Sequence, residues 1–107
     1  MAKVSPNSDA ELRSKARLRA NHKVIAENRQ HVERTIHIVN VSANCFMIDG
    51  NPGYQRGERV ELRLPVIGMI EALVTWTVEQ RVGLQFERAL SLPDFLALLD
   101  MIGPKTG

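Results

Sequence analysis

The chain has 107 residues, 44% hydrophobic and 24% charged, which predicts a single globular domain with one core. Its 14 basic and 12 acidic side chains leave a net charge of +2, a small excess that does not indicate a nucleic acid polymer as partner. A lone cysteine excludes an internal disulfide, and the chain shows neither a signal-like segment nor an apolar run of about 18 residues, so we expect a cytoplasmic protein without membrane insertion.

The chain begins with a segment that lacks periodicity. Residues 1–7 are expected to be a flexible lead-in. Residues 8–11, Ser-Asp-Ala-Glu, have the spacing of a capping box, in which serine and glutamate satisfy each other's backbone amides. They predict a short helix over about 9–16. We expect one domain over 8–103, followed by a tail over 104–107.

Six segments show the alternation or the composition of β-strands. They are expected at 18–26, 33–41, 45–49, 59–64, 70–78 and 82–87. The first has an indistinct pattern, which is typical of an edge strand. The fifth has the clearest inward face, made of Ile70, Ala72, Val74, Trp76 and Val78.

The period changes to that of a helix near the end of the chain. Ser91 is the expected N-cap, and Gly103-Pro104 is the expected stop. One helical face would carry Leu92, Phe95, Leu96, Leu99 and Ile102. The fold class is therefore mainly β: a small six-stranded antiparallel barrel with a short N-terminal helix, closed at an open edge or mouth by a C-terminal amphipathic helix.

Two polar groups could carry a function. Asn40 and Ser42 lie at a short corner between the second and third strands. Arg13 and Arg17 are spaced i, i+4, so a helix would place both guanidinium groups on one side. Together with Arg19 they form the densest group of fixed charges, although a solvated helix face explains such a pair on its own.

The order of these groups resembles the PilZ domain, a bacterial receptor module for cyclic di-GMP. The resemblance rests on Arg13-Ser14-Lys15-Ala16-Arg17, followed by Asn40-Val41-Ser42-Ala43-Asn44-Cys45. It extends from about Arg13 to Phe95 and includes the segments around Gly57-Glu58-Arg59, Val74-Thr75-Trp76 and Val82-Gly83-Leu84-Gln85-Phe86. It implies a six-stranded barrel with a C-terminal helix, as the periodicity does.

The ligand implied by the resemblance is cyclic di-GMP, with no other cofactor. Arginine pairs bidentately with guanine or with phosphate oxygens, and Arg13 and Arg17 would take these roles, with Arg19 beside them. The Asn40 carbonyl would accept from a guanine N–H, more weakly than an aspartate. Ser42 would either contact the ligand or brace the turn. A protein partner would receive the signal through a change in the N-terminal segment and in the interaction surface.

Cys45 stands where the family motif has glycine. If that position needs a positive φ, the strain costs on the order of 1 to 3 kcal/mol, unless Asn44 takes the left-handed conformation instead. If the glycine makes room for the ligand, the Cys45 side chain would collide with it. The alternative function is accordingly a PilZ-like protein-interaction module that does not bind the nucleotide.

Other functions have less support. No nucleophile or base has an activating partner in sequence, so we expect no catalytic residues and no enzyme. The three histidines lack metal-ligand spacing, so we expect no metal site. Only 5% of the residues are aromatic, which disfavours a barrel that stacks single-stranded nucleic acid.

Overall fold

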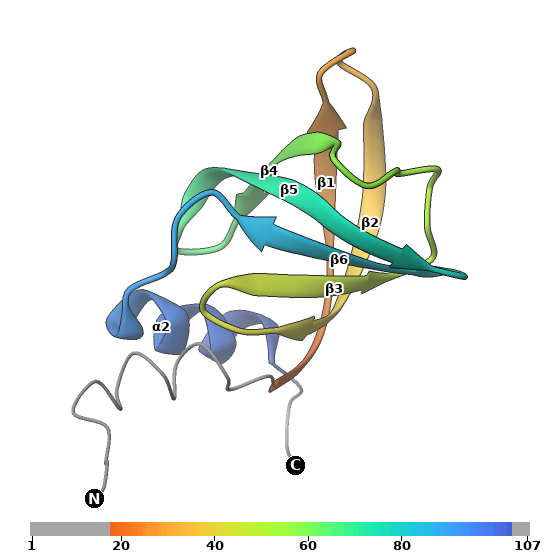
Figure 1. Ribbon diagram of the computed structural model, residues 1–107. Coiled ribbons are helices and arrows are strands. Elements are labelled where there is room, and N and C mark those ends of the chain that lie inside the picture. Colours follow the sequence, from red (N-terminus) through yellow and green to blue (C-terminus); the bar gives the residue numbers. More distant parts are fainter. Residues whose placement is uncertain (1–17, 104–107) are drawn as a thin grey trace, which may run out of the picture.

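The structure is a computed structural model that describes residues 18–103. Its elements, in chain order, are β1 (Leu18–Asn28), β2 (Glu33–Val41), β3 (Cys45–Asp49), β4 (Arg59–Leu64), β5 (Gly68–Val78), β6 (Arg81–Phe86) and α2 (Leu92–Ile102) (Figure 1). The expected lead-in, the capped helix and the tail over 104–107 lie outside the described residues.

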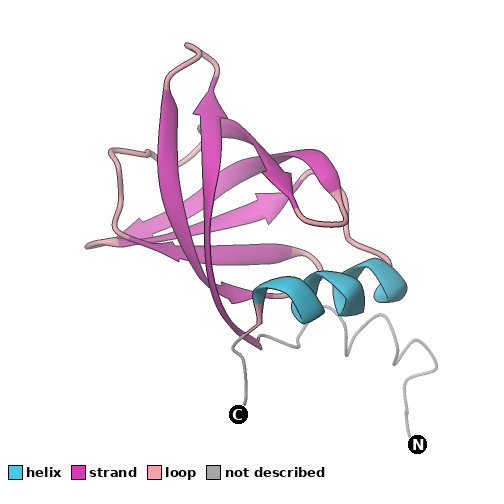
Figure 2. Ribbon diagram, turned by 180° about the vertical axis from the view of Figure 1, so that it is seen from behind, coloured by secondary structure: helices cyan, strands magenta, loops and turns pink. Residues whose placement is uncertain are grey.

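The strands form a closed antiparallel barrel in the order β1-β2-β3-β6-β5-β4, with α2 below it (Figures 1 and 2). This confirms the expected barrel and C-terminal helix. The expectation that the first strand is an edge is wrong, because β1 pairs with β2 and, over Ala26–Asn28, also with β4. Its weak alternation has another cause: a bulge between Arg19 and His22 interrupts the register. No helix among the described residues is long and apolar enough to cross a membrane.

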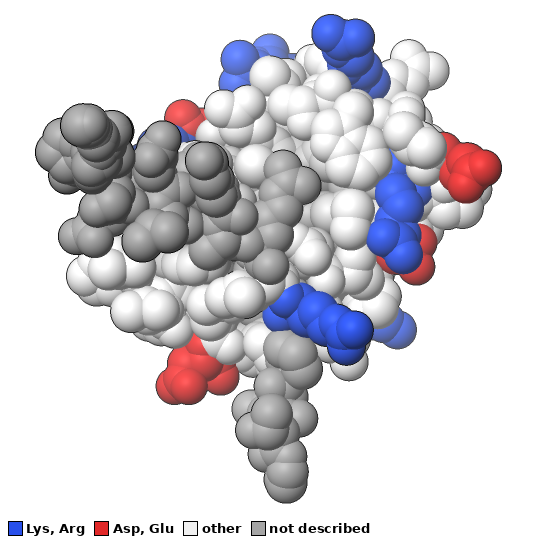
Figure 3. Space-filling model, turned by 60° about the horizontal axis from the view of Figure 1, so that its bottom comes forward, with Lys and Arg blue, Asp and Glu red and all other residues white. Residues whose placement is uncertain are grey.

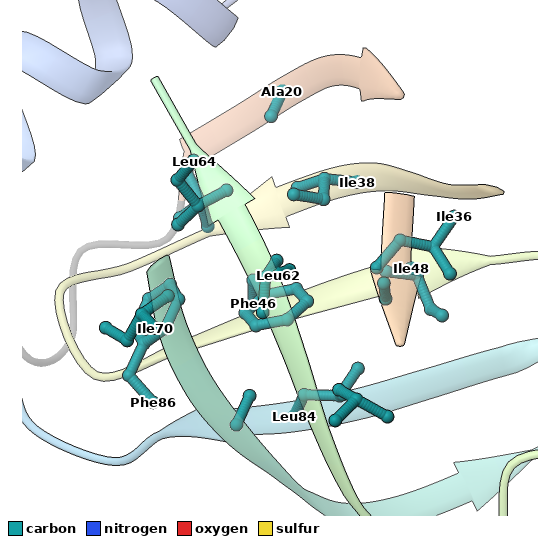
Figure 4. Close-up of a cluster of buried hydrophobic side chains, with 14 of the residues drawn as sticks. Ala20, Ile36, Ile38, Phe46, Ile48, Leu62, Leu64, Ile70, Leu84 and Phe86 are labelled. Atoms are coloured by element: carbon teal, nitrogen blue, oxygen red, sulfur yellow. The ribbon is translucent and has the colours of Figure 1, made fainter. Parts of the chain in front are cut away.

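The core fills the inside of the barrel with side chains from every strand (Figure 4). The aromatic rings of Phe46 and Phe86 have centroids 5.0 Å apart, and Ile48 and Leu84 beside them are fully buried. Each such side chain stabilises the fold by about 1.5 to 3 kcal/mol. A rigid barrel results, on whose outer face side chains can be held in fixed positions.

The end of β5 differs from the sequence expectation. Ile70, Ala72 and Val74 point inward, but Trp76 is 37% exposed and Val78 is 60% exposed. The reason is a bulge, since Val74 pairs with Leu84 while Trp76 pairs with the preceding residue of β6, Gly83. The inserted residue shifts the alternation, so that Trp76 points outward.

The C-terminal helix has its expected ends but a rotated face. The Ser91 hydroxyl accepts from the Asp94 amide at 3.2 Å, which confirms the N-cap. Leu98 is fully buried, whereas Leu92 and Leu96, which were expected on the inner face, are 41% and 55% exposed. Leucines occur on several sides of this helix, so the apolar period alone could not determine which row of leucines packs against the barrel.

Glutamates form an acidic row across the outside of the barrel, at the end away from α2. The register places Glu33 beside Glu27, Glu27 beside Glu61, and Glu61 beside Glu71. Glu27 has His31 as a partner at 2.7 Å and Glu71 has Arg59 at 3.7 Å. Glu61, in the middle of the row, has no ion pair with another described residue, and like charges directly opposite each other destabilise a sheet.

We therefore predict that Glu61→Gln stabilises the protein. Removing the central carboxylate should raise the free energy of unfolding by about 0.5 kcal/mol in low salt, and the gain should shrink in high salt, which screens exposed charges. Urea denaturation at two salt concentrations measures both effects. The control is Glu79→Gln, which removes a carboxylate outside the row and should change little; an equal gain in both variants would contradict the assignment.

Candidate functional site

The polar corner between β2 and β3 is braced by its own serine. Ser42 is 1% exposed, and its hydroxyl accepts from the Cys45 amide at 3.1 Å while the Ser42 amide donates to the Cys45 carbonyl at 2.7 Å. The next two carbonyls, of Ala43 and Asn44, accept from the amides of Leu90 and Phe86, each at 2.8 Å. The corner is thus tied to the segment that joins β6 to α2, and the Ser42 hydroxyl is used as a brace.

The corner contains no left-handed residue. Within 18–103, non-glycine residues with positive φ are His31, Val66 and Glu79, and neither Asn44 nor Cys45 is among them. Of the alternatives that the sequence leaves open, a left-handed conformation at Asn44 and positive-φ strain at Cys45 are therefore both absent. The Ser42 hydroxyl and the two tied carbonyls close the corner at negative φ, so the effect of Cys45 is reduced to the space its side chain fills.

A row of residues crosses the outer face of the barrel beside this corner. The register places Arg19 of β1 opposite Asn40 of β2, and Asn40 opposite Met47 of β3. Met47 is opposite Gly83 of β6, and Gly83 is opposite Trp76 of β5. Neighbours of this row in sequence, such as Phe46 and Leu84, are buried, so the row itself faces outward.

The indole of Trp76 lies flat against Gly83. A Cβ atom added to Gly83 would overlap the Nε1 and Cε2 atoms of this ring, so only glycine allows the ring to cover the strand at this position. The Thr75 hydroxyl donates to the Gly83 carbonyl at 3.1 Å and holds the bulge that turns Trp76 outward. A partly exposed aromatic ring therefore has a fixed place on the barrel surface.

These features enclose a hollow of about 330 Å³ on the outside of the barrel. Its lining residues are Asn40, Ser42, Cys45, Phe46, Met47, Thr75, Trp76, Gly83, Leu84 and Gln85. None of them is charged. An aromatic ring on one side and neutral hydrogen-bonding groups around it suit a planar, polar ligand such as a nucleobase.

The structure brings together four of the residues predicted from sequence. Asn40, Ser42 and Cys45 line the hollow, and Arg19 lies next to Asn40 across the strands. Asn44 does not line the hollow; its carbonyl belongs to the corner. The other two predicted residues, Arg13 and Arg17, lie outside the described residues.

Trp76, Met47, Thr75 and Gln85 line the hollow but were not predicted from sequence. The sequence contains one feature that could have indicated the position of Trp76. Glycine within a strand often marks a bulge or the close approach of another group, and Gly83 is such a residue in β6. Pairing it with Trp76 requires the register between two strands, which the sequence alone does not provide.

A second hollow, of about 360 Å³, lies at the end of the barrel away from the corner. Glu27, Glu61 and Glu71 line it together with Arg29 and Arg59. Three carboxylates against two guanidinium groups would repel phosphate groups. The hollow beside Trp76 is therefore the better candidate for a nucleotide.

Tyr54 is buried and lines neither of these two hollows. Its hydroxyl has no hydrogen-bond partner among the described residues. Burial, reinforced by the nearby charge of Glu58 and opposed by Arg34, raises the pKa of Tyr54 above its usual value. The phenol therefore stays neutral and acts as part of the core.

The lysines and arginines among residues 18–103 are not gathered into one patch on the face that carries α2. Figure 3, which looks toward this end of the molecule, shows lysine and arginine side chains at several separate places with uncharged surface between them. Arg81, close to the hollow, is engaged with Asp49 at 3.2 Å and with the Met47 sulfur at 3.9 Å. Charge recognition at the hollow would therefore depend on a few particular arginines.

Comparison with solved structures identifies the fold. The PilZ domain of CeSA from a cellulose-synthesizing bacterium superposes with a TM-score of 0.60 at 14% identity, over 82% of this chain and 95% of that one. The Bacillus subtilis inhibitor of motility, MotI/DgrA, superposes with a TM-score of 0.53 at 20% identity, over 81% of this chain. This chain spans about half of that protein, 48% of its length.

Neither comparison by sequence gives a match. No family model matches the chain, and no curated protein matches it. The structural matches confirm the resemblance at the level of the fold: the chain forms a PilZ-like domain.

We predict that Gly83→Ala moves the indole away from the barrel. The added methyl group would force the Trp76 ring outward, so its fluorescence emission should shift to longer wavelength. The free energy of unfolding should fall by about 1 to 3 kcal/mol. Trp76 is the only tryptophan of the chain, which makes the signal specific.

The control is Gly50→Ala, since Gly50 has a φ of 86° and open space around its Cβ position. This variant should lose stability through backbone strain without changing the emission. An unchanged emission in Gly83→Ala would contradict the stacked geometry.

Proposed function

We propose that the chain is a receptor for cyclic di-GMP and that it has no catalytic activity. The observation that carries the proposal is the uncharged hollow walled by Trp76, which opens beside Asn40 at the corner of the motif. One guanine of the ligand occupies this hollow. The phosphates and the other guanine are met by Arg19 and by Arg13 and Arg17, whose roles follow from the resemblance.

The chemistry of the hollow suits a guanine. The exposed face of Trp76 offers a stacking surface, and stacking of a base on an aromatic ring contributes about 1 to 3 kcal/mol. The Asn40 carboxamide has no hydrogen bond to another described residue and can accept from guanine N1–H or N2–H. Arg19, directly across from Asn40, is placed to meet a phosphate with a charge-assisted hydrogen bond.

The signal is passed on as a change of surface. A dianionic ligand that joins Arg13 and Arg17 to the barrel alters what the N-terminal segment offers to a protein partner. The Bacillus subtilis neighbour of this fold is named an inhibitor of motility. For this chain we propose a regulatory function that is exerted through a partner protein. The binding of this partner to the chain should change when cyclic di-GMP is added.

We predict that calorimetry detects binding of cyclic di-GMP and that Arg17→Ala weakens it at least tenfold. The loss of one arginine contact to a guanine or a phosphate is worth about 1 to 3 kcal/mol. Titration should also change the fluorescence of Trp76, because the base stacks on its ring. Arg63→Ala serves as the control: Arg63 is exposed and lies opposite Met69 across β4 and β5, and neither residue lines the hollow, so affinity should be unchanged.

The absence of both heat and a thermal shift at high ligand concentration would rule out the receptor. An affinity unaffected by Arg17→Ala would instead leave the receptor standing and remove the role given to that arginine.

A second candidate function is a protein-interaction module without a nucleotide. It is favoured by one observation: Cys45 lines the hollow with its side chain half-buried, where the motif has glycine. The sulfur lies 3.7 Å from the Ser42 hydroxyl and takes up space that a guanine could use.

Cys45→Gly distinguishes the two functions. If the wild-type protein fails to bind and the variant binds cyclic di-GMP, the sulfur blocks an otherwise intact site. If both fail, the interaction module is the better description. The receptor predicts that the wild type binds and that the variant binds with a similar or higher affinity. The variant should lose about 1 kcal/mol of stability, as expected for glycine in a strand, so the titrations are made well below its melting temperature.

A further inference from the structure

Two neutral carboxamides without a hydrogen-bond partner line the hollow in the described part of the chain. Asn40 lies at one side and Gln85 at another, and neither side chain has a hydrogen bond to another described residue. Gln85 is opposite Cys45 across β3 and β6, and its side chain is exposed. Both amides are therefore available to a ligand.

The hydroxyl protons in the hollow are already in use. The Ser42 hydroxyl is bonded to the Cys45 backbone, and the Thr75 hydroxyl donates to the Gly83 carbonyl. Among residues 18–103, no carboxylate or guanidinium lines the hollow. The edge of a bound base would thus be read by Asn40 and Gln85.

A carboxamide does not impose one order of donor and acceptor. It carries both a carbonyl oxygen and an NH₂ group, and rotation by 180° exchanges them. It can bond to O6 and N1–H of guanine, and equally well to N6–H and N7 of adenine. A carboxylate, by contrast, is only an acceptor: it matches the N1–H and N2–H donors of guanine and is repelled by the ring nitrogens of adenine.

We infer that the hollow accepts adenine as well as guanine, so that the chain binds mixed cyclic GMP-AMP with nearly the affinity it has for cyclic di-GMP. In the mixed ligand the adenine occupies the hollow, while the guanine lies outside it, toward Arg19. The inference rests on the proposed function, because it describes the selectivity of that same site. It extends the ligand class from one cyclic dinucleotide to two.

The test is calorimetric titration of the full chain with cyclic di-GMP and with mixed cyclic GMP-AMP. The expected result is a ratio of dissociation constants within tenfold. If cyclic di-GMP binds and the mixed ligand is weaker by more than tenfold, the inference is overturned while the receptor function stands. If neither ligand binds, both the inference and the proposed function fail.

A double variant, Asn40→Asp with Gln85→Glu, tests the residues themselves. The two carboxylates keep the size of the side chains but accept hydrogen bonds only, so the mixed ligand should become at least tenfold weaker relative to cyclic di-GMP. The added negative charge, or any loss of structure, weakens both ligands alike, so the ratio is the readout. A ratio equal to that of the wild type would overturn the assignment.

The matched control is Gln30→Glu. It makes the same chemical change in the turn between β1 and β2, where Gln30 is exposed and lines a different hollow. Its ratio should remain that of the wild type, and a shift in this control as large as in the double variant would also overturn the assignment.

Discussion

Bulges in the barrel strands determine which side chains point outward beside the hollow. The register shifts between Arg19 and His22 in β1, between Ile38 and Asn40 in β2, and between Val74 and Trp76 in β5. Each shift borders a member of the same cross-strand row. A bulge changes which face a side chain joins, so these irregularities bring a tryptophan and an asparagine to the same side of the sheet without disturbing the core beneath them.

The hydroxyl of Ser42 fixes the shape of the corner, a role that a glycine at position 45 would fill by a different backbone conformation. A glycine at the end of the motif would let the backbone turn at positive φ, but here a buried serine accepts the Cys45 amide and holds the turn closed. The corner is also fixed from the other side by Leu90 and Phe86. The replacement of glycine by Cys45 consequently changes the width of the hollow rather than the path of the chain.

Regular alternation was enough to predict most of the fold. The bounds of the second, third and fourth strands agree with those of β2, β3 and β4, because their buried residues mostly alternate and polar segments separate them, although the buried positions of β2 shift from Ile38 to Val41 across its bulge. Trp76 shows where this reasoning stops. Its position depends on one inserted residue in the pairing of β5 with β6, and a bulge of this kind leaves the apolar pattern of the strand itself unchanged.

Part of the site could likewise be predicted. Asn40, Ser42 and Cys45 belong to one short segment of the sequence and reach the hollow together. Met47, Gln85 and the Trp76 ring join them only through strand pairing, and β6 follows β3 in the sheet although two strands separate them in sequence. The C-terminal helix gives a similar case, because Leu96 and Leu98 are equally apolar and only packing against the barrel decides which of them is buried.

The same geometry assigns different roles in ligand binding to the arginines and to the residues that line the hollow. The described residues that line the hollow are all uncharged and do not attract a dianion by themselves, whereas arginines attract any phosphate with little regard for the base. On the proposed function, affinity would come mainly from the arginines and selectivity mainly from the two carboxamides and the stacked ring. A substitution at an arginine would then change the affinity for all cyclic dinucleotides together. A substitution in the hollow would change which of these ligands binds most tightly.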